Sequence, residues 1–268
     1  MKTIVITGST RGIGYGLADS FAALGCSIVL SGRKRENVEQ AVKRLAEKHP
    51  SAGIAGFPCD VRELGQVQKL WDEAIKQFGQ VDIWINNAGI SNAMAPAWTL
   101  PQNDIERVIQ TNIIGAINGC SVAVTNMLKQ GHGAVYNMEG LGSEKYRHIA
   151  GMSLYAMTKA ALRYYDDSLF QELKGKPVIA GAIQPGMVVT DLITAQSDGN
   201  EAQFKQVKWI TNIIGNSVEE VTPWIAAKVL ANTKNGARFR FMNTGKTMLR
   251  FLTAPFSKRD LFKDFVNH

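Results

Sequence analysis

The sequence has few of the residues that build disulfide frameworks or metal sites, because its 268 residues include only 3 cysteines and 4 histidines. Cys26, Cys59 and Cys120 are widely separated, lie among apolar residues and show no metal-ligand spacing, so we expect three buried thiols and no metal. No apolar run approaches the roughly 20 residues that span a bilayer. Residues 1–4 enter a strand pattern directly, without the features of a signal peptide, so a reducing cytoplasm is the expected location.

Acidic residues are scarce at the end of the chain. The net charge is +7, and the residues from Lys234 onward contain 8 Lys or Arg against 2 Asp or Glu, which is +6 and leaves +1 for the first 233 residues. These basic residues do not form the regular basic helix typical of nucleic-acid binding, and we expect no nucleic-acid partner. With 45% hydrophobic and 20% charged residues, the composition predicts one globular domain over residues 1–268.

A glycine turn follows the first predicted strand. The β-branched run 2–7 is followed by three glycines within seven residues and then by the amphipathic stretch 15–24. Gly8 permits a tight turn, Gly12 lets the backbone approach a pyrophosphate, and Gly14 lets the helix pack closely on the strand. Any strand-to-helix junction can use glycines, but this position favours a nucleotide site at the helix N-terminus. The residues expected to contact the nucleotide here are Gly8, Ser9, Thr10, Arg11, Gly12, Ile13 and Gly14.

The end of the second predicted strand, 26–30, lacks an acidic residue. A free ribose 2′-hydroxyl favours an acid near this strand end, whereas a 2′-phosphate favours arginine. The chain has Arg33 there, and the first acid is Glu36. Arg33, helped by Arg11, therefore favours NADP over NAD. The alternative is that the basic residues 33–35 only begin a solvated helix.

The rest of the chain alternates between strand and helix patterns. Strands are predicted at 54–59, 81–85, 133–138 and 178–183, and helices at 37–48, 64–78, 102–129 and 153–173. This alternation predicts an α/β fold, a doubly wound parallel sheet in three layers, with helices on both faces. Polar or small residues follow several strands, at the edge where ligands bind in such sheets. Asp60 and Val61 could contact an adenine, or Asp60 could cap the helix that begins near residue 63; Asn87, Ala88 and Gly89 are expected beside the dinucleotide.

Tyr155 and Lys159 are four residues apart in a predicted helix, so they share one face. An ammonium beside a phenol favours the phenolate, which makes the two residues a candidate proton-transfer pair. Asn112 is a polar amide inside an otherwise apolar helix pattern and needs a hydrogen-bonding partner.

Together these motifs resemble the classical short-chain dehydrogenases/reductases. Thr7-Gly8-x-x-x-Gly12-x-Gly14, Asn86-Asn87-Ala88-Gly89, Asn112, Tyr155-x-x-x-Lys159 and Pro185-Gly186 occur in that family's order and spacing. The resemblance implies a Rossmann-type oxidoreductase that uses NADP(H) here. Tyr155 would be the acid/base, Lys159 would hold the nicotinamide ribose and lower the phenol pKa, and Asn112 would anchor a relay water. It also implies cofactor contacts at Pro185, Gly186 and Val188, and a homodimer or homotetramer.

The chain departs from the family at the end of the fifth strand, where a serine usually polarises the carbonyl. By strand alignment that position is Gly140, but by distance to Tyr155 the candidate is Ser143, which we take as the fourth catalytic residue. Glu139 is an alternative, because a buried, protonated carboxyl could donate to a carbonyl oxygen. A catalytically silent NADP(H)-binding sensor or assembly protein is the alternative for the whole chain.

A narrower resemblance, to the chlorophyll b reductase branch, covers the string Asn137-Met138-Glu139-Gly140-x-Gly142-Ser143 and the ending 239–262. It implies reduction of a bulky, apolar carbonyl. Residues from about 191 to 221 should cover this substrate with apolar side chains. The basic, aromatic C-terminal segment, about 239–268, could lie on an anionic membrane surface or dock on a neighbouring subunit.

Overall fold

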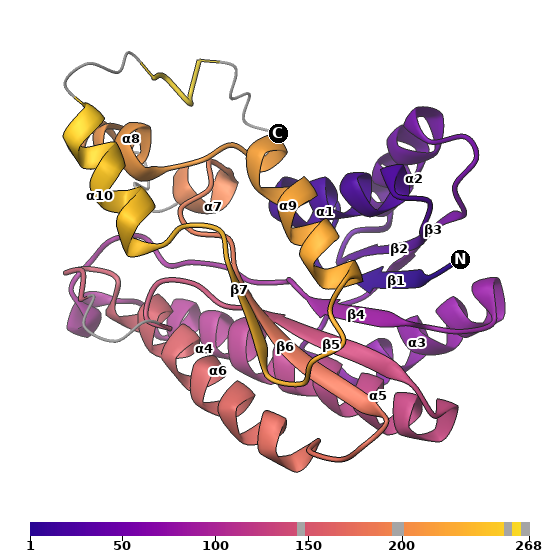
Figure 1. The fold of residues 1–268 in the computed structure, drawn as a ribbon. Helices are drawn as coiled ribbons and strands as arrows, with labels where there is room; N and C mark the ends of the chain where they lie inside the picture. Colours follow the sequence, from indigo (N-terminus) through magenta and orange to yellow (C-terminus); the bar gives the residue numbers. More distant parts are fainter. Residues whose placement is uncertain (144–147, 195–200, 255–258, 264–268) are drawn as a thin grey trace.

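The computed structural model describes residues 1–143, 148–194, 201–254 and 259–263. A single sheet of parallel strands runs through the molecule in the order β3-β2-β1-β4-β5-β6-β7 (Figure 1). The strands are β1 Thr3–Ile6, β2 Ser27–Gly32, β3 Ile54–Pro58, β4 Ile83–Asn86, β5 Gly133–Met138, β6 Val178–Gln184 and β7 Ala237–Arg240. The order reverses between β1 and β4, which places a ligand crevice at the carboxyl ends of those two strands.

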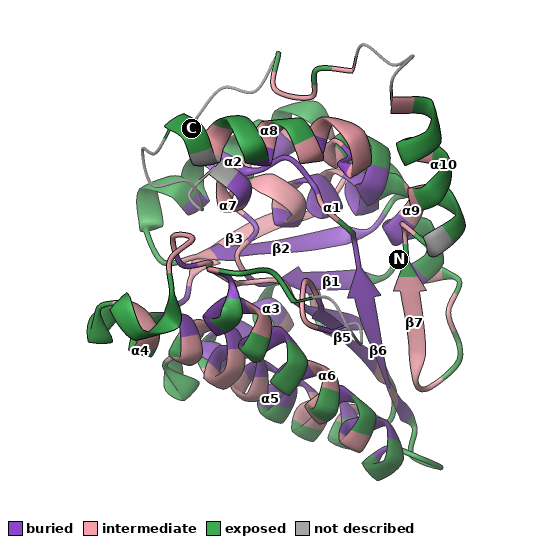
Figure 2. Cartoon of the chain, turned by 90° about the vertical axis from the view of Figure 1, so that its left-hand side faces the viewer, coloured by how far each residue is buried: buried purple, intermediate pink, exposed green. Residues whose placement is uncertain are grey.

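Helices cover both faces of the sheet, and the predicted three-layer Rossmann-type fold is confirmed (Figure 2). One layer contains α1 Gly12–Ala23, α2 Arg35–Lys48 and α9 Val218–Leu230, and the other contains α3 Leu64–Phe78, α4 Gln102–Ile109, α5 Gly115–Gln130 and α6 Ser153–Glu172. A π-helical turn, η2 Gln110–Ile114, joins α4 to α5, and a 3-10 turn, η1 Ala97–Thr99, precedes α4. Three helices lie beyond the carboxyl ends of the strands: α7 Asp191–Thr194, α8 Glu201–Ile214 and α10 Thr244–Thr253.

Alternation along the strands divides the core between the two faces. Ile4 and Ile6 of β1 pack with the α1 and α9 side, whereas Val5 packs with Trp84 on the α3 and α5 side. Both clusters are fully apolar at their centres, so the central strands are fixed between two layers. Cys26, Cys59 and Cys120 are buried free thiols, as predicted.

Two strands differ from the sequence prediction, one in its limit and one because it was not predicted. β2 continues to Gly32, so Arg33 follows the strand directly. β7 was not predicted, because its four residues include two arginines and look like part of a basic surface segment. The proposed peripheral segment that begins near 239 therefore starts inside the sheet, and this boundary was wrong.

The continuous helical stretch 102–130 is long and apolar enough to cross a membrane by length and composition. The sequence analysis had found no such segment. In the structure α5 packs against α3 and against β4 and β5, and η2 packs against α6. These contacts account for the apolar residues as the buried side of a core helix.

Candidate active site

Three glycines allow the turn after β1 to lie against the end of β4. Gly8 and Gly12 have φ angles of +61° and +57°, in the left-handed region that favours glycine. A Cβ atom on Gly8 would lie 2.8 Å from Ala88 Cα, and one on Gly14 would lie 2.5 Å from Asn87 Nδ2. Side chains at these two positions would push the turn away from β4, so the close packing requires the glycines.

Polar side chains fasten this turn to its neighbours. The Thr7 hydroxyl oxygen accepts from the main-chain N–H groups of Asn87 (3.0 Å) and Ala88 (3.1 Å). In return, the Asn87 amide donates to Gly8 O at 2.9 Å. The buried Ser9 hydroxyl donates to the main chain of β1 at 2.7 Å. The Ser9 hydroxyl and the Asn87 amide nitrogen are therefore used to hold the turn in place.

The turn fits the pyrophosphate of a dinucleotide. Helix α1 begins at Gly12 inside the turn, and no side chain caps its N-terminus. Free main-chain N–H groups at a glycine-lined helix N-terminus bind phosphate. Thr10 and Ile13 lie in the same turn and are partly exposed. Arg11 was predicted to help Arg33 favour NADP. In the structure its guanidinium forms an ion pair with Asp191 at 2.6 Å and so connects the turn to the start of α7.

Arg33 is exposed directly after β2, and no acidic residue precedes it there. Asp60, at the end of β3, is held by Arg62, whose guanidinium lies 2.6 Å from the carboxylate and is the main cause of the lowered pKa of Asp60; Arg33 lowers it further. The predicted capping role of Asp60 was wrong, because α3 has Glu63 at its N-cap with no side-chain cap bond. Val61 is buried next to it.

The segment after β6 presents a free main-chain donor. Gly186 has a φ of +81°, and Val188 forms a parallel bridge with Asn216. In that bridge Val189 N donates to Asn216 O and Asn216 N donates to Met187 O. The Val188 N–H group points the other way and has no partner among the described residues. It is therefore available to a hydrogen-bond acceptor of a bound cofactor, which is consistent with the cofactor contacts implied for Pro185, Gly186 and Val188.

Helix α6 places Tyr155 and Lys159 in one buried site. The two residues are 7% and 5% exposed, and Lys159 Nζ lies 5.8 Å from the centre of the Tyr155 ring. The ammonium donates to Met138 O at 2.8 Å. Burial raises the pKa of Tyr155 to about 12 and lowers that of Lys159 to about 8. The predicted lowering of the phenol pKa by Lys159 is therefore not produced by the chain itself, because burial opposes both charged forms.

Asn112 lies in the π-helical turn and meets the other site residues. Its Oδ1 accepts from Ile90 N at 2.9 Å, and its Nδ2 donates to Ile90 O (2.9 Å) and to Thr158 Oγ1 (3.0 Å). A Cβ atom on Gly89 would lie 3.4 Å from Asn112 Oδ1 and 3.7 Å from Lys159 Nζ. The end of β4, the π turn and α6 thus converge, and π turns of this kind are frequent at functional sites.

Two supporting residues were not found from the sequence. Asn92 is buried in the loop after β4, and its Oδ1 accepts from Tyr155 N at 3.2 Å, which fixes the first turn of α6. Thr158 donates to Tyr155 O at 2.7 Å and accepts from Asn112. Neither has a periodic or motif signal of its own. The only available signal for Asn92 was an amide three residues after the Asn86–Gly89 motif.

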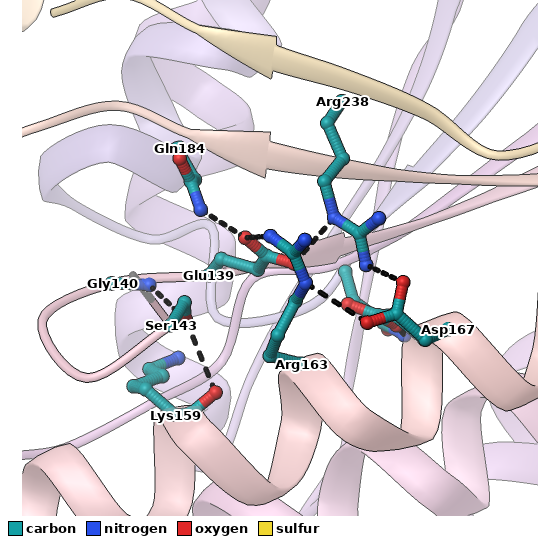
Figure 3. A network of polar contacts seen from close by, with 10 residues as sticks. Glu139, Gly140, Ser143, Lys159, Arg163, Asp167, Gln184 and Arg238 are labelled. Atoms are coloured by element: carbon teal, nitrogen blue, oxygen red, sulfur yellow. Dashed lines mark hydrogen bonds and ion pairs between the residues drawn. The ribbon is translucent and has the colours of Figure 1, made fainter. Parts of the chain in front are cut away.

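The turn 139–143 shows where the family's serine is missing. Gly140 lies against the phenol, since a Cβ atom on it would be 2.8 Å from Tyr155 Oη. The Ser143 hydroxyl donates to Lys159 O (3.1 Å) and accepts from Gly140 N (3.2 Å), so it closes the turn onto α6 (Figure 3). Strand alignment, and not distance along the chain, identifies the position beside Tyr155.

Glu139 does not provide the alternative donor. Its fully buried carboxylate accepts from Arg238 Nε at 3.1 Å and lies 3.8 Å from Arg163 Nη1, while Gln184 donates to it as well (Figure 3). Both carboxylate oxygens are taken up by these internal contacts, so the hypothesis that Glu139 donates to a substrate was wrong.

The covering region and the C-terminal segment pack on each other. Arg250 and Arg259 both donate to Gly215 O at the end of α8, at 2.6 and 3.3 Å. Phe262 packs edge-on against Phe204 of α8, with 5.8 Å between ring centres. Part of the segment therefore docks within its own chain. Residues 195–200 of the covering region, and Phe256, Lys258 and Phe265 of the segment, lie outside the described residues.

Comparisons with known proteins agree with this site. The family model described as short chain dehydrogenase matches residues 2–201. Chlorophyll(ide) b reductase NOL of Arabidopsis thaliana is 35% identical over 256 residues, which covers 93% of this chain and 70% of that protein. The NOL protein of Oryza sativa subsp. japonica is 34% identical, with 93% and 71% covered. A longer Arabidopsis relative, NYC1, is 29% identical, and the match spans 98% of this chain but 55% of that protein.

Solved structures show the same architecture. Gluconate 5-dehydrogenase from Burkholderia cenocepacia, in complex with NADP and tartrate, is 28% identical with a TM-score of 0.77 over 92% of this chain and 95% of that one. Levodione reductase has a TM-score of 0.82 at 23% identity, covering 92% and 98% of the two chains, and supports the fold. With the sequence motifs, the site geometry and the family match together, the chain belongs to the short chain dehydrogenase family.

Proposed function

We propose that the chain is an NADP(H)-dependent oxidoreductase that reduces a bulky, apolar ketone or aldehyde to an alcohol. The observation that carries this proposal is the buried Tyr155 phenol, next to Lys159 and with Gly140 instead of a side chain against its oxygen. Such a phenol can donate a proton to a carbonyl oxygen.

Each site residue has a separate role in the proposed reaction. NADPH, when bound, supplies the hydride. Tyr155, whose pKa burial raises to about 12, is protonated at neutral pH and can hydrogen-bond to the carbonyl oxygen before giving up its proton. Lys159 supplies the nearby positive charge that favours the phenolate once the proton has left. Asn112, held in place by Ile90 and Thr158, would anchor the water that returns a proton.

The choice of NADP over NAD rests on the end of β2. Arg33 is exposed there, directly after the strand, and can reach a 2′-phosphate, while a carboxylate that would repel it is absent from the described residues between Ser31 and Arg35. The related gluconate 5-dehydrogenase binds NADP.

The bulky substrate class is supported by the relatives and by exposed apolar residues near the site. Two relatives at about one-third identity are chlorophyll(ide) b reductases. Trp209 of α8 is 63% exposed, and the neighbouring α10 exposes Met248, Leu249, Phe251 and Leu252. With the basic residue Lys246 on the same short helix, this surface also favours contact with an anionic membrane from which a lipophilic substrate could enter.

We also propose a homodimer or homotetramer built on α6. Its outer face exposes the apolar side chains of Met157, Ala160, Ala161 and Tyr164, with Tyr164 76% exposed. Residues spaced in this way form one stripe along a helix, and such a stripe is usually covered by another helix. Static light scattering of the purified protein measures the oligomer size.

Turnover by the purified protein tests the function. NADPH oxidation is measured against ketones and aldehydes graded from small and polar to bulky and apolar, including formyl tetrapyrroles. We expect activity at the bulky end, and Tyr155→Phe should reduce kcat on the order of 10²-fold or more while the Kd for NADPH changes less than about twofold. Turnover that survives this change would show that another group is the acid.

A redox sensor or assembly protein is the second candidate. One observation favours it: among the residues that the structure describes, no hydroxyl takes the serine's place, because Gly140 lies beside the phenol and Ser143 bonds to the main chain. NADPH binding without turnover across the whole carbonyl panel would support this function over the first.

A further inference from the structure

Arg44 of α2 reaches the glycine turn after β1. Helices α1 and α2 lie in the same layer, and α2 packs against both α1 and β2 (Figure 2). The Arg44 guanidinium donates from Nη2 to Thr10 O at 3.2 Å and lies over the Tyr15 ring, with 4.8 Å between Cζ and the ring centre. A main-chain acceptor and an aromatic face thus hold the charged end of an exposed side chain beside the turn.

The same threonine lies against the end of β2, where the 2′-phosphate is expected. A Cβ atom on Gly32 would lie 2.8 Å from Thr10 Cγ2, and Arg33 is the next residue after Gly32. Arg33 and Arg44 therefore flank Thr10, one from β2 and one from α2. The Thr10 side chain is partly exposed, and its hydroxyl has no partner among the described residues. Two guanidinium groups and a hydroxyl thus lie around one point of the turn.

Arg44 differs from the other basic residues of its helix in having no acidic partner. Each of the others lies within ion-pair distance of an acid: Arg35 is 3.8 Å from Glu39, Lys43 is 4.0 Å from Glu47, and Lys48 is 2.8 Å from Asp19. In the part of the chain that the structure describes, no carboxylate lies within this distance of Arg44. Its charge is therefore available to an anionic ligand.

The acids on the neighbouring elements are already bound by other cations. Asp19 of α1, one turn after Tyr15, lies 2.8 Å from Lys48 and 2.8 Å from His49. Asp60, which follows the neighbouring strand β3, lies 2.6 Å from the Arg62 guanidinium. Neither acid forms an ion pair with Arg33 or Arg44. The positive charge beside Thr10 is therefore left without an internal counter-charge from these acids.

Arg11, which was expected to provide the second positive charge, faces a different neighbour. Its guanidinium lies 2.6 Å from Asp191 of α7. The next residue also borders that segment, since a Cβ atom on Gly12 would lie 3.3 Å from Thr190 Cγ2. Thr10 borders β2 and α2 instead. The cation held at the Thr10 side of the turn is thus Arg44.

We propose that Arg44 is a specificity-determining residue that binds the 2′-phosphate of NADP(H) together with Arg33 and Thr10. The role rests on the proposed function, which includes the choice of NADP. One N–H group of Arg44 is used on Thr10 O, and the other donors of its guanidinium can bond to phosphate oxygens. Tyr15 and Thr10 O hold the group in advance, so little side-chain freedom is lost on binding. NAD(H), which has a hydroxyl in place of the phosphate, gains little from this charge.

Binding of 2′,5′-ADP and of 5′-AMP tests the role of Arg44 without turnover, because these nucleotides differ only in the 2′-phosphate. Isothermal titration calorimetry measures both. We expect Arg44→Gln to raise the Kd for 2′,5′-ADP about 10-fold and that for 5′-AMP less than about twofold. Arg44→Lys keeps the charge but not the planar fork, so its loss should be smaller. Both variants should fold like wild type, because the side chain is exposed.

Lys43→Gln is the matched control for loss of positive charge. It removes the same charge from the adjacent position of the same helix, where Lys43 is paired with Glu47 and has no contact with the turn. We expect its Kd values for both nucleotides to stay within about twofold of wild type.

A second readout follows the phosphate itself. The 31P NMR signal of bound NADP+ gives the pKa of the 2′-phosphate from a titration between pH 4.5 and 8. A nearby guanidinium favours the dianion, so Arg44→Gln should raise this pKa by about half a pH unit, while Lys43→Gln should leave it unchanged. A loss of affinity caused only by altered packing of α2 would not move the phosphate titration in this way.

Several results would overturn the role of Arg44. These are an unchanged phosphate titration in Arg44→Gln, equal losses for the two nucleotides, or a selective loss of 2′,5′-ADP in Arg11→Gln without one in Arg44→Gln. Equal affinity of the wild-type protein for both nucleotides would refute the choice of NADP and this role together. Selective 2′,5′-ADP binding that depends on Arg44, without turnover of any carbonyl, would leave this role intact and refute the oxidoreductase function.

Discussion

A side chain at position 140 would meet the phenol oxygen of Tyr155, because the Cβ atom would lie 2.8 Å from Oη and 3.5 Å from Lys159 Cγ. Real Cβ contacts are not this short, so either the turn or the Tyr155 ring would have to move. The glycine is therefore part of how this chain holds its proton donor.

Restoring the family's serine with Gly140→Ser should damage the enzyme. We expect kcat/KM for a bulky aldehyde to fall on the order of 10²-fold, since small displacements of a catalytic group carry large rate penalties. Steady-state NADPH oxidation measures the effect, and Gly65→Ser, at a helix position with open space, is the control. A higher rate in Gly140→Ser would show instead that the missing hydroxyl limits the reaction.

Ser143→Ala distinguishes a carbonyl donor from a residue that closes the turn. The Ser143 hydroxyl makes two internal hydrogen bonds, to Lys159 O and from Gly140 N. We expect a loss of about 1 to 2 kcal/mol in the free energy of unfolding and less than about a tenfold change in kcat. Urea unfolding and kinetics are measured on the same preparation. A drop in kcat above a hundredfold with unchanged stability would make Ser143 the carbonyl donor after all.

Arg33→Ala should separate the two cofactors. A guanidinium on a phosphate contributes about 1.5 to 3 kcal/mol, so the Kd for NADPH should rise about 10- to 100-fold and that for NADH less than about threefold. Cofactor fluorescence measures both constants. Lys34→Ala, one residue further along the same exposed loop, is the control for general loss of positive charge. Equal losses for NADPH and NADH in Arg33→Ala would remove Arg33 from the phosphate site.

Local sequence patterns were sufficient for the fold and for the residues at strand ends. The β-branched run 2–7 and the glycines after it predicted β1 and its turn, because both depend on neighbouring residues. The spacing of Tyr155 and Lys159 was likewise enough to place both on one buried face of α6. Such features are encoded within a few residues, so periodicity and turn chemistry reveal them.

Long-range contacts could not be predicted in this way. Glu139 was the alternative carbonyl donor, but its carboxylate is bound by Arg238, which lies 99 residues further along the chain on a strand that its two arginines made look like surface. Which of two hydrogen-bonding partners a polar side chain selects depends on the packing of distant elements, and no local pattern carries that information.

Asp166→Asn should change how stability depends on pH. The folded pKa of Asp166, about 8, is above the ordinary value of 3.8, so between about pH 4 and 8 the folded chain binds a proton that the unfolded chain has lost. The stability contributed by this group is full below pH 4 and is lost as the pH rises towards 8. Asparagine keeps the size of the side chain and has no proton to lose.

The variant should therefore be about as stable as wild type at pH 5 and increasingly more stable than it towards pH 7.5, by on the order of 1 kcal/mol per pH unit at most. Urea unfolding at pH 5, 6, 7 and 7.5 measures this. Above pH 8 Lys159 has the opposite effect on stability. Its folded pKa of about 8 lies below the ordinary value of 10.5, so the unfolded chain binds a proton that the folded chain has lost and stability rises with pH. The measurement therefore ends at pH 7.5. Asp167→Asn is the control: Arg163 and Arg238 lower the pKa of that exposed acid, so its loss should reduce stability equally across pH 5 to 7.5. Parallel curves for Asp166→Asn and wild type would mean that Asp166 is ionised in the folded chain.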